Sequence, residues 1–272
     1  MGYSIFTNTM VDMTWSAIDA AAKRGAIVLL PIGIIEEHGP HLGLGVDLYS
    51  AYLVTVKVKN RLAELGVEAL IAPPHYWGIS RATAVFAGTF SVSPETMKGL
   101  IVDIIINLRN WGFQKVFTVN WHADTEHCRV LLDAIREARE ETGLDARYVV
   151  TEADLRRLRL TGEESAILVQ RDAPPLDSSH GPYADVHAGS METAVMVKYF
   201  PEGIDTDFVK GLEGTKLTWK DLGGLGRSEE ETRRLIPDGY FGNPAGYDTK
   251  AAEEYIDAIV ESYARSLKET LG

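Results

Sequence analysis

The sequence predicts an α/β fold in which a mostly parallel sheet is covered by helices on both sides. Short apolar runs rich in branched residues alternate with longer segments of helical spacing, and this alternation repeats along the first 150 residues. Strands joined in this way have right-handed crossovers and parallel neighbours. The chain has 272 residues, 45% of them hydrophobic, which is ample for a core. Because no linker, repeat or low-complexity tract interrupts it, we interpret residues 1–272 as a single domain.

The first elements of this alternation lie before residue 113. Residues 25–33, GAIVLLPIG, have the composition of a strand buried on both faces. Residues 47–66 change to helical spacing and stop at a glycine. The apolar run at 67–74 predicts a second strand, which its prolines end. A helix is predicted over 93–112, because it begins with a serine suited to the N-cap and has a proline in its first turn.

The second group of elements begins with a third buried strand at 115–120. An amphipathic helix follows at 125–143, and a fourth strand at 146–150. The last helix is predicted over 250–271, where apolar residues recur on one side.

Two long segments interrupt this pattern in the second half of the chain. Residues 171–190 form a polar loop, and residues 212–247 are rich in glycine with few periodic signals. Loops of this length inside a domain are often functional, so we expect both to border a site.

Composition and charge exclude several functions. A net charge of −12 with dispersed lysines and arginines argues against nucleic-acid binding. The longest apolar runs are too short to cross a bilayer, and no signal peptide is evident, so we expect a cytoplasmic protein with no membrane partner. Cys128 is the only cysteine, which rules out an intrachain disulfide and favours a packed side chain.

Two polar clusters follow strands of the predicted sheet. EEHGPHLGLGVD, residues 36–47, comes after the first strand, and NWHADTEH, residues 120–127, comes after the third. Parallel strands end at a common edge, so the two clusters are expected to meet there.

The clusters contain residue types that bind divalent metals. Within each cluster an acid and a histidine stand two apart, so in an extended segment they point to the same side. The candidate ligands are Glu36, His38, Asp47, His122 and Asp124. Two imidazoles and three carboxylates could hold two ions with one carboxylate bridging, and mixed nitrogen and oxygen ligands suit zinc or manganese. A solvated charged turn is the structural alternative for each cluster, and the residues alone leave both interpretations open.

The segment PIGIIEEHGPHLGLGVD also resembles the signature of the creatininase family of metal-dependent amidohydrolases. Four further segments resemble that family in the same order, namely YWGISRATAVFAGTFSVSPET, VFTVNWHAD, VHAGSMETAVM and GYFGNPAGYDTKAA. The resemblance implies a three-layer α/β/α sandwich. It also implies a homo-oligomer, commonly a hexamer, that acts on a small-molecule substrate.

The resemblance assigns roles to the candidate ligands. It implies that Glu36 and His122 bind one metal ion, that His38 and Asp124 bind the other, and that Asp47 bridges them. Zinc and manganese are the expected metals, with iron as a further option. Glu37 stands where relatives often carry glutamine, and it is expected to be only a neighbour of the ligands.

Three residues outside the two clusters also receive roles from the resemblance. Ser80 matches a serine that contacts the substrate, and His187 matches a histidine that acts in proton transfer. Glu192 matches the acidic residue of the family's E-T-S segment, and we expect it to orient His187 or to accept a substrate hydrogen bond. Four other histidines are expected to support the site or to be structural, namely His41, His75, His127 and His180.

Several positions near the expected pocket differ from the family pattern. Thr83 stands where relatives often have histidine, Ala87 where they have proline, and Ala123 where creatininase has tyrosine. These differences predict that creatinine itself is not the substrate. We expect hydrolysis of a cyclic amide or another C–N bond. The alternatives are ring C–C hydrolysis of a keto-inositol such as 3-dehydro-scyllo-inosose, deformylation of a formamide or formamidopyrimidine, and a non-catalytic metal-stabilised binding protein.

Overall fold

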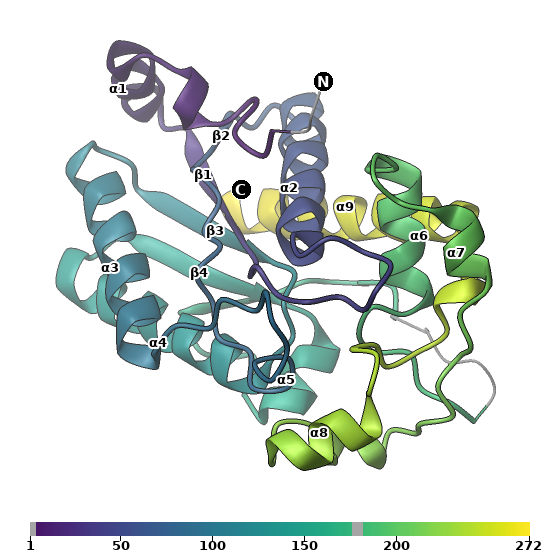
Figure 1. Ribbon diagram of the computed structural model, residues 1–272. Helices are drawn as coiled ribbons and strands as arrows, with labels where there is room; N and C mark the ends of the chain where they lie inside the picture. The colour runs from purple at the N-terminus through teal and green to yellow at the C-terminus, as the bar shows by residue number, and fades with distance from the viewer. Residues whose placement is uncertain (1–3, 176–181) are drawn as a thin grey trace.

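A parallel sheet forms the centre of the protein, whose computed structural model describes residues 4–175 and 182–272 (Figure 1). Within these residues the sheet has five strands in the order β2-β1-β3-β4-β5, and every recorded pairing is parallel. The strands are β1 (Ile27–Ile32), β2 (Ala69–Ile71), β3 (Lys115–Asn120), β4 (Asp145–Val150) and β5 (Ile167–Val169). The predicted α/β class and parallel sheet are therefore confirmed. His180 and part of the predicted loop at 171–190 lie outside the described residues.

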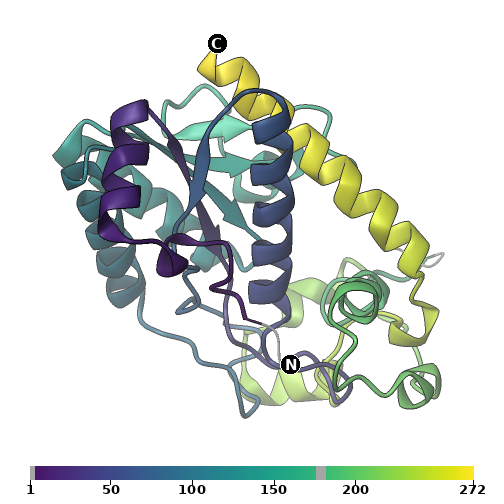
Figure 2. The ribbon, with the colours of Figure 1, turned by 90° about the horizontal axis from the view of Figure 1, so that it is seen from above.

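Helices cover both faces of this sheet, as Figure 2 shows. One face carries α1 (Trp15–Arg24), α3 (Pro94–Asn110) and α4 (Thr125–Thr142), and the other carries α2 (Val46–Glu64) and α9 (Thr249–Leu271). The remaining short elements are α5 (Glu152–Leu158), α6 (Ser190–Tyr199), α7 (Thr206–Lys210), α8 (Glu229–Leu235) and the 3₁₀ turns at Met10–Asp12, Asp221–Gly224 and Pro244–Gly246. In Figure 1, α6 lies beside α9 with α7 next to it, and α8 lies apart from them at the bottom of the view.

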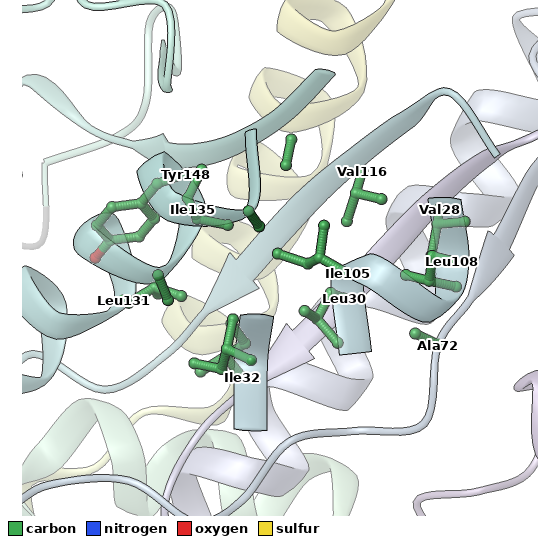
Figure 3. Packing of buried hydrophobic residues seen from close by; sticks show 14 of the residues in the cluster. Val28, Leu30, Ile32, Ala72, Ile105, Leu108, Val116, Leu131, Ile135 and Tyr148 are labelled. Carbon is green, nitrogen blue, oxygen red and sulfur yellow. The ribbon is translucent and has the colours of Figure 1, made fainter. Parts of the chain in front are cut away.

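Strand β1 is buried on both faces, as its composition predicts. Val28, Leu30 and Ile32 belong to the apolar cluster under α3 and α4, part of which Figure 3 shows. Ile27 and Leu29 belong to the cluster under α2 and α9. Burying each side chain of this size contributes about 1.5–3 kcal/mol. The alternation fixes the strand between the two layers, so the loop that follows it leaves the sheet at a defined point.

The register of β1 and β3 brings the two predicted clusters together. Pairing runs from Val28 with Val116 to Ile32 with Asn120, so both strands end at the same level. Trp121 then donates its backbone N–H to the carbonyl oxygen of Ile32. The loops that begin after these strands therefore start side by side at the carboxyl edge of the sheet.

The predicted elements are found with shifted ends. The strand expected at 67–74 is reduced to the three residues of β2, because the segment leaves the sheet before its two prolines. Ser93 caps α3 as expected, accepting a hydrogen bond from the backbone N–H of Thr96. Cys128 is buried in α4, also as expected. Among the described residues, we find no helix with the length and apolar character needed to span a membrane.

Candidate metal centre

Four of the five predicted ligands meet at the carboxyl edge of the sheet. Glu36 and His38 lie on the loop after β1, Asp47 lies in the first turn of α2, and His122 lies just after β3. All four side chains are buried. Buried ionisable groups are stable only when they are paired or bind a cation, so their contacts show what the site is built to hold.

His122 directs one ring nitrogen at two carboxylates. Its Nδ1 lies 3.1 Å from Oε1 of Glu36 and 2.8 Å from Oδ2 of Asp47. Its Nε2 lies 2.9 Å from the carbonyl oxygen of Ile79. A carbonyl oxygen only accepts, so Nε2 carries the proton and the lone pair of Nδ1 faces the carboxylates. Lone pairs at this separation repel one another unless a cation or a proton lies between them.

His38 repeats this arrangement on the other side of Asp47. Its Nδ1 lies 3.1 Å from the carbonyl oxygen of Glu36 and therefore carries the proton. Its Nε2 lies 3.6 Å from Oδ1 of Asp47 and 3.8 Å from Oε2 of Glu192. Within the part of the chain that the structure describes, neither Nε2 of His38 nor Oδ2 of Asp47 has a hydrogen-bond partner. Asp47 therefore presents one oxygen to each histidine, which is the arrangement of a bridging carboxylate.

The electrostatics of this group favour positive charge. Burial disfavours the charged form of His38, but Asp47 and Glu192 outweigh it and raise the pKa of His38 to about 10. Burial is likewise outweighed at His122, whose pKa the carboxylates of Glu36 and Asp47 raise well above its usual value. Divalent cations satisfy the same demand, and an imidazole fixed by a hydrogen bond at its other nitrogen is the usual form of a metal-binding histidine.

Among the residues that the structure describes, three combinations of side chains place one donor atom each within 4.8 Å of one another: Glu36, Asp47 and His122; His38, Asp47 and Glu192; Glu36, His38 and His187. The first two share Asp47, and each combines one imidazole with two carboxylates. This donor set fits zinc or manganese.

Residues behind Glu36 hold its carboxylate in place. The hydroxyl of Thr83 donates to Oε2 of Glu36. Oγ of Ser80 lies 2.6 Å from Oγ1 of Thr83, and Ser80 is buried. Ser80, which is predicted to contact the substrate, is thus linked through Thr83 to the candidate ligand Glu36.

Asp124 is the one predicted ligand that lies outside these three combinations. Its carboxylate caps α4, with Oδ1 accepting hydrogen bonds from the backbone N–H groups of Glu126 at 2.8 Å and His127 at 3.0 Å. Its Oδ2 accepts one from the backbone N–H of Arg81 at 3.2 Å. An aspartate before a helix is a typical N-cap, so the sequence itself contained a signal for this second role.

His187 and Glu192 join the group from the second half of the chain. The ring of His187 lies 4.4 Å from that of His38. Glu192 lies in the first turn of α6, where Oε2 accepts a hydrogen bond from the backbone N–H of Ala188 at 2.6 Å, and burial raises the pKa of its carboxyl. The structure therefore brings both predicted residues to the metal ligands, with Glu192 close enough to be a ligand itself.

The contact of Glu37 with His187 is not predicted from the sequence. The carboxylate of Glu37 lies against His187, with 3.4 Å between Oε1 and Nε2. Thr83 was likewise noted only as a difference from relatives, whereas it holds Glu36. The position of Glu37 between two ligands was the available signal, but its partner is 150 residues away in the sequence.

The other described histidines have partners of their own. Nε2 of His41 lies 3.0 Å from Oγ1 of Thr193, next to Glu192 in α6, and burial lowers the pKa of His41 to about 4. The ring of His127 stands edge-on to that of His122, with 4.8 Å between ring centres. His75 is buried and donates from Nε2 to the carbonyl oxygen of Trp77 at 2.9 Å.

The known proteins that are similar to this chain include several members of one family. A family model described as creatininase, creatinine amidohydrolase, matches residues 11–267. The chain is 29% identical over 267 residues to a mycofactocin precursor peptide peptidase of Mycobacterium ulcerans (strain Agy99), covering 95% of this chain and 89% of that protein. It is 28% identical over 219 residues to a creatinine amidohydrolase of Pseudomonas putida, covering 77% of each. A 3-dehydro-scyllo-inosose hydrolase of Thermotoga maritima matches over 111 residues at 30% identity, covering 40% of this chain and 34% of that protein.

Solved structures show the same fold. A creatininase described as a manganese form superposes with a TM-score of 0.72 at 20% identity, covering 97% of this chain and 98% of the other. A creatininase variant described as a Zn-Zn type superposes with a TM-score of 0.68 at 20% identity, covering 99% of both chains.

Proposed function

This chain belongs to the creatininase family of amidohydrolases, and we propose that it hydrolyses a C–N bond of a small cyclic amide other than creatinine at a site for two divalent ions. One observation supports this above all: two buried histidines, each with its second nitrogen bonded to a backbone carbonyl, direct their remaining nitrogens at the two oxygens of Asp47. Such a group has the ligands for a pair of metal ions that share one carboxylate.

We assign Glu36, Asp47 and His122 to one ion, and His38, Asp47 and Glu192 to the other. Asp124, the second-ion ligand predicted from the resemblance, is the alternative to Glu192. Zinc and manganese fit these donors. Bound there, divalent ions supply Lewis acidity for a carbonyl group and lower the pKa of a water molecule.

Side chains and backbone carbonyls of the protein hold the metal ligands in place, and one histidine transfers a proton. Thr83 orients the carboxylate of Glu36, and the carbonyl oxygen of Ile79 fixes the ring of His122. Nε2 of His187 donates to the carbonyl oxygen of Glu37, which leaves the lone pair of Nδ1 to take up a proton from the attacking water and to pass it to the leaving group. In this proposal His187 is the proton donor, while Ser80 supports Glu36 through Thr83 and borders the substrate.

A peptide amide is the second candidate substrate. The relative that aligns with 95% of this chain is named a precursor peptide peptidase, and hydrolysis of a peptide breaks the same kind of bond. Ring C–C hydrolysis of a keto-inositol is the third, because one relative is named a 3-dehydro-scyllo-inosose hydrolase. Formamide deformylation remains a further alternative from the sequence.

A turnover screen tests the proposal. Protein loaded with zinc or with manganese is incubated with creatinine, hydantoins, other cyclic amides, formamides, short peptides and keto-inositols, and Asp47→Ala is the matched inactive control. We expect turnover of a cyclic amide that Asp47→Ala abolishes. Turnover of peptides or keto-inositols alone would replace the proposed substrate class. No turnover of any compound by fully metal-loaded protein would contradict the proposal.

A further inference from the structure

Glu37 has two unusual features for a residue that is expected to be only a neighbour of the ligands. It is buried, and its Oε1 has no hydrogen-bond partner among the described residues. Its other oxygen, Oε2, accepts a hydrogen bond from the backbone N–H of Gly39 at 2.9 Å. A buried carboxylate oxygen without a donor costs free energy, so its position calls for a reason.

The group nearest to that oxygen is the imidazole of His187. Oε1 of Glu37 lies 3.4 Å from Nε2 of His187, and the carbonyl oxygen of Glu37 lies 2.9 Å from the same nitrogen. One residue thus offers two acceptors to a single ring nitrogen. Because neither acceptor can donate, both favour the form of His187 that carries its proton on Nε2.

A second segment of the chain, which contains Gly239 and Phe241, packs against both residues of this contact. Gly239 has a φ of +76°, and a Cβ built there would lie 2.1 Å from Oε2 of Glu37. Two residues later, Phe241 exchanges backbone hydrogen bonds with His187, at 3.2 Å and 2.8 Å. The segment that anchors the backbone of His187 therefore also leaves room for the carboxylate of Glu37 by having no side chain at position 239.

We propose that Glu37 is a positioning residue for His187, which its carboxylate and carbonyl oxygen hold in the Nε2-protonated form so that Nδ1 remains available to the substrate. This inference rests on the proposed function, in which His187 supplies a proton to the leaving group. It explains why the side chain at position 37 presents an acceptor at both ends, one bonded to the N–H of Gly39 and one facing Nε2 of His187.

Glutamine at this position would satisfy only one of the two contacts. Its amide oxygen can accept a hydrogen bond from the N–H of Gly39, but its NH₂ group then faces the N–H of His187, so two donors meet. If the amide is rotated, the NH₂ group faces the N–H of Gly39 instead, and two donors meet there. Glu37→Gln keeps the volume of the side chain, so it separates the acceptor role from simple packing. Glu202→Gln is the matched control, because Glu202 is exposed.

The experiment has a spectroscopic and a kinetic readout, both on zinc-loaded protein. The ring nitrogens of His187 are observed by ¹⁵N NMR and assigned by comparison with His187→Gln. We expect the Nε2-protonated form in the wild type and in Glu202→Gln, and its loss or mixing with the other form in Glu37→Gln. In turnover of the substrate found by the screen, we expect kcat of Glu37→Gln to fall by about 10- to 100-fold with KM and metal content unchanged.

Two results would overturn the inference. One is an unchanged His187 spectrum in Glu37→Gln, which would show that the carboxylate does not select the form of the ring. The other is a wild-type kcat for Glu37→Gln when His187→Gln is inactive. The NMR result decides the first point even if no substrate is found, so failure of the proposed function is distinguishable from failure of this inference.

Discussion

Nδ1 of His122 and Oδ2 of Asp47 lie 2.8 Å apart, while Nε2 of His122 donates its proton to the carbonyl oxygen of Ile79. Both side chains are buried, and the carboxylates raise the pKa of His122, so without a metal ion a second proton on Nδ1 faces Asp47. A divalent cation would replace that proton and attract the carboxylates more strongly, which links the stability of the fold to metal binding.

Removing metal should therefore destabilise the protein. Ions present at about 100 times their dissociation constant stabilise a native state by about 2.7 kcal/mol, and each kcal/mol changes the melting temperature by about 2–4 °C at this chain size. We expect chelation to lower the melting temperature by roughly 5–10 °C, and zinc or manganese to restore it. Asp47→Ala is the control and should not respond to either treatment. A wild-type melting temperature that is insensitive to chelator and to added metal would refute the metal centre.

The second ion offers a test between Glu192 and Asp124. Oε2 of Glu192 lies 3.8 Å from Nε2 of His38. The carboxylate of Asp124, in contrast, already accepts hydrogen bonds from three backbone N–H groups. We expect Glu192→Gln to lose about half of the bound metal, as measured by elemental analysis of dialysed protein. Asp124→Asn removes the charge but keeps a good N-cap residue, so it should keep full metal content. The opposite pattern would return Asp124 to the ligand set.

The predicted metal clusters illustrate how much of this site a sequence can reveal. Glu36, His38 and His122 follow buried strands directly, and the end of a parallel strand has a known place in the fold. The periodicity of the sequence therefore predicted the sheet, and the order of its strands predicted that these three residues lie close together. Asp47 followed from its position at the start of the next helix.

Other parts of the site depend on contacts that periodicity does not encode. Glu192 lies on the short helix α6 and His187 in the loop before it, and their place in the site was predicted from resemblance alone. The contact between Glu37 and His187 forms across 150 residues, and the glycine at position 239 that makes room for it has no local signal of that role. Short elements such as α6 and β5 are positioned by packing, so their sequences carry little periodic information.

Acid should weaken the fold through His75. Burial lowers the pKa of this imidazole to about 4, from an unfolded value of about 6.5. Because the folded pKa is the lower one, the unfolded state binds a proton first as the pH falls. The stabilisation is complete above pH 6.5 and is lost between about pH 6.5 and 4, by up to roughly 3 kcal/mol.

Denaturant unfolding with chelator present, at pH values from 7 to 4, measures this effect without interference from metal loss. His75→Gln keeps a donor for the carbonyl oxygen of Trp77 and cannot titrate. We expect its free energy of unfolding to fall less steeply with acid than that of the wild type. Identical slopes for the two proteins would show that His75 does not contribute.

The backbone of Gly33 packs closely against that of Asp47. A Cβ built at Gly33 would lie 2.9 Å from the carbonyl carbon of Asp47 and 2.9 Å from the backbone nitrogen of Leu48. The obstacle is backbone at the first turn of α2, which cannot move away as a flexible side chain would. Gly33→Ala must therefore displace the start of α2, and with it the carboxylate that both histidines face.

We expect Gly33→Ala to cost about 1–3 kcal/mol of stability and to weaken metal binding as well. Titration calorimetry with zinc and unfolding with and without chelator measure the two effects. Gly99→Ala is the matched control, because Gly99 is exposed within α3, has nothing within 4 Å of its built Cβ and should gain about 0.5–1 kcal/mol. The loss in Gly33→Ala should be larger with metal present than with chelator, because displacing Asp47 removes an attraction that is stronger in the metal-bound state. An equal loss in both conditions would mean that the strain stays in the backbone and does not reach the carboxylate.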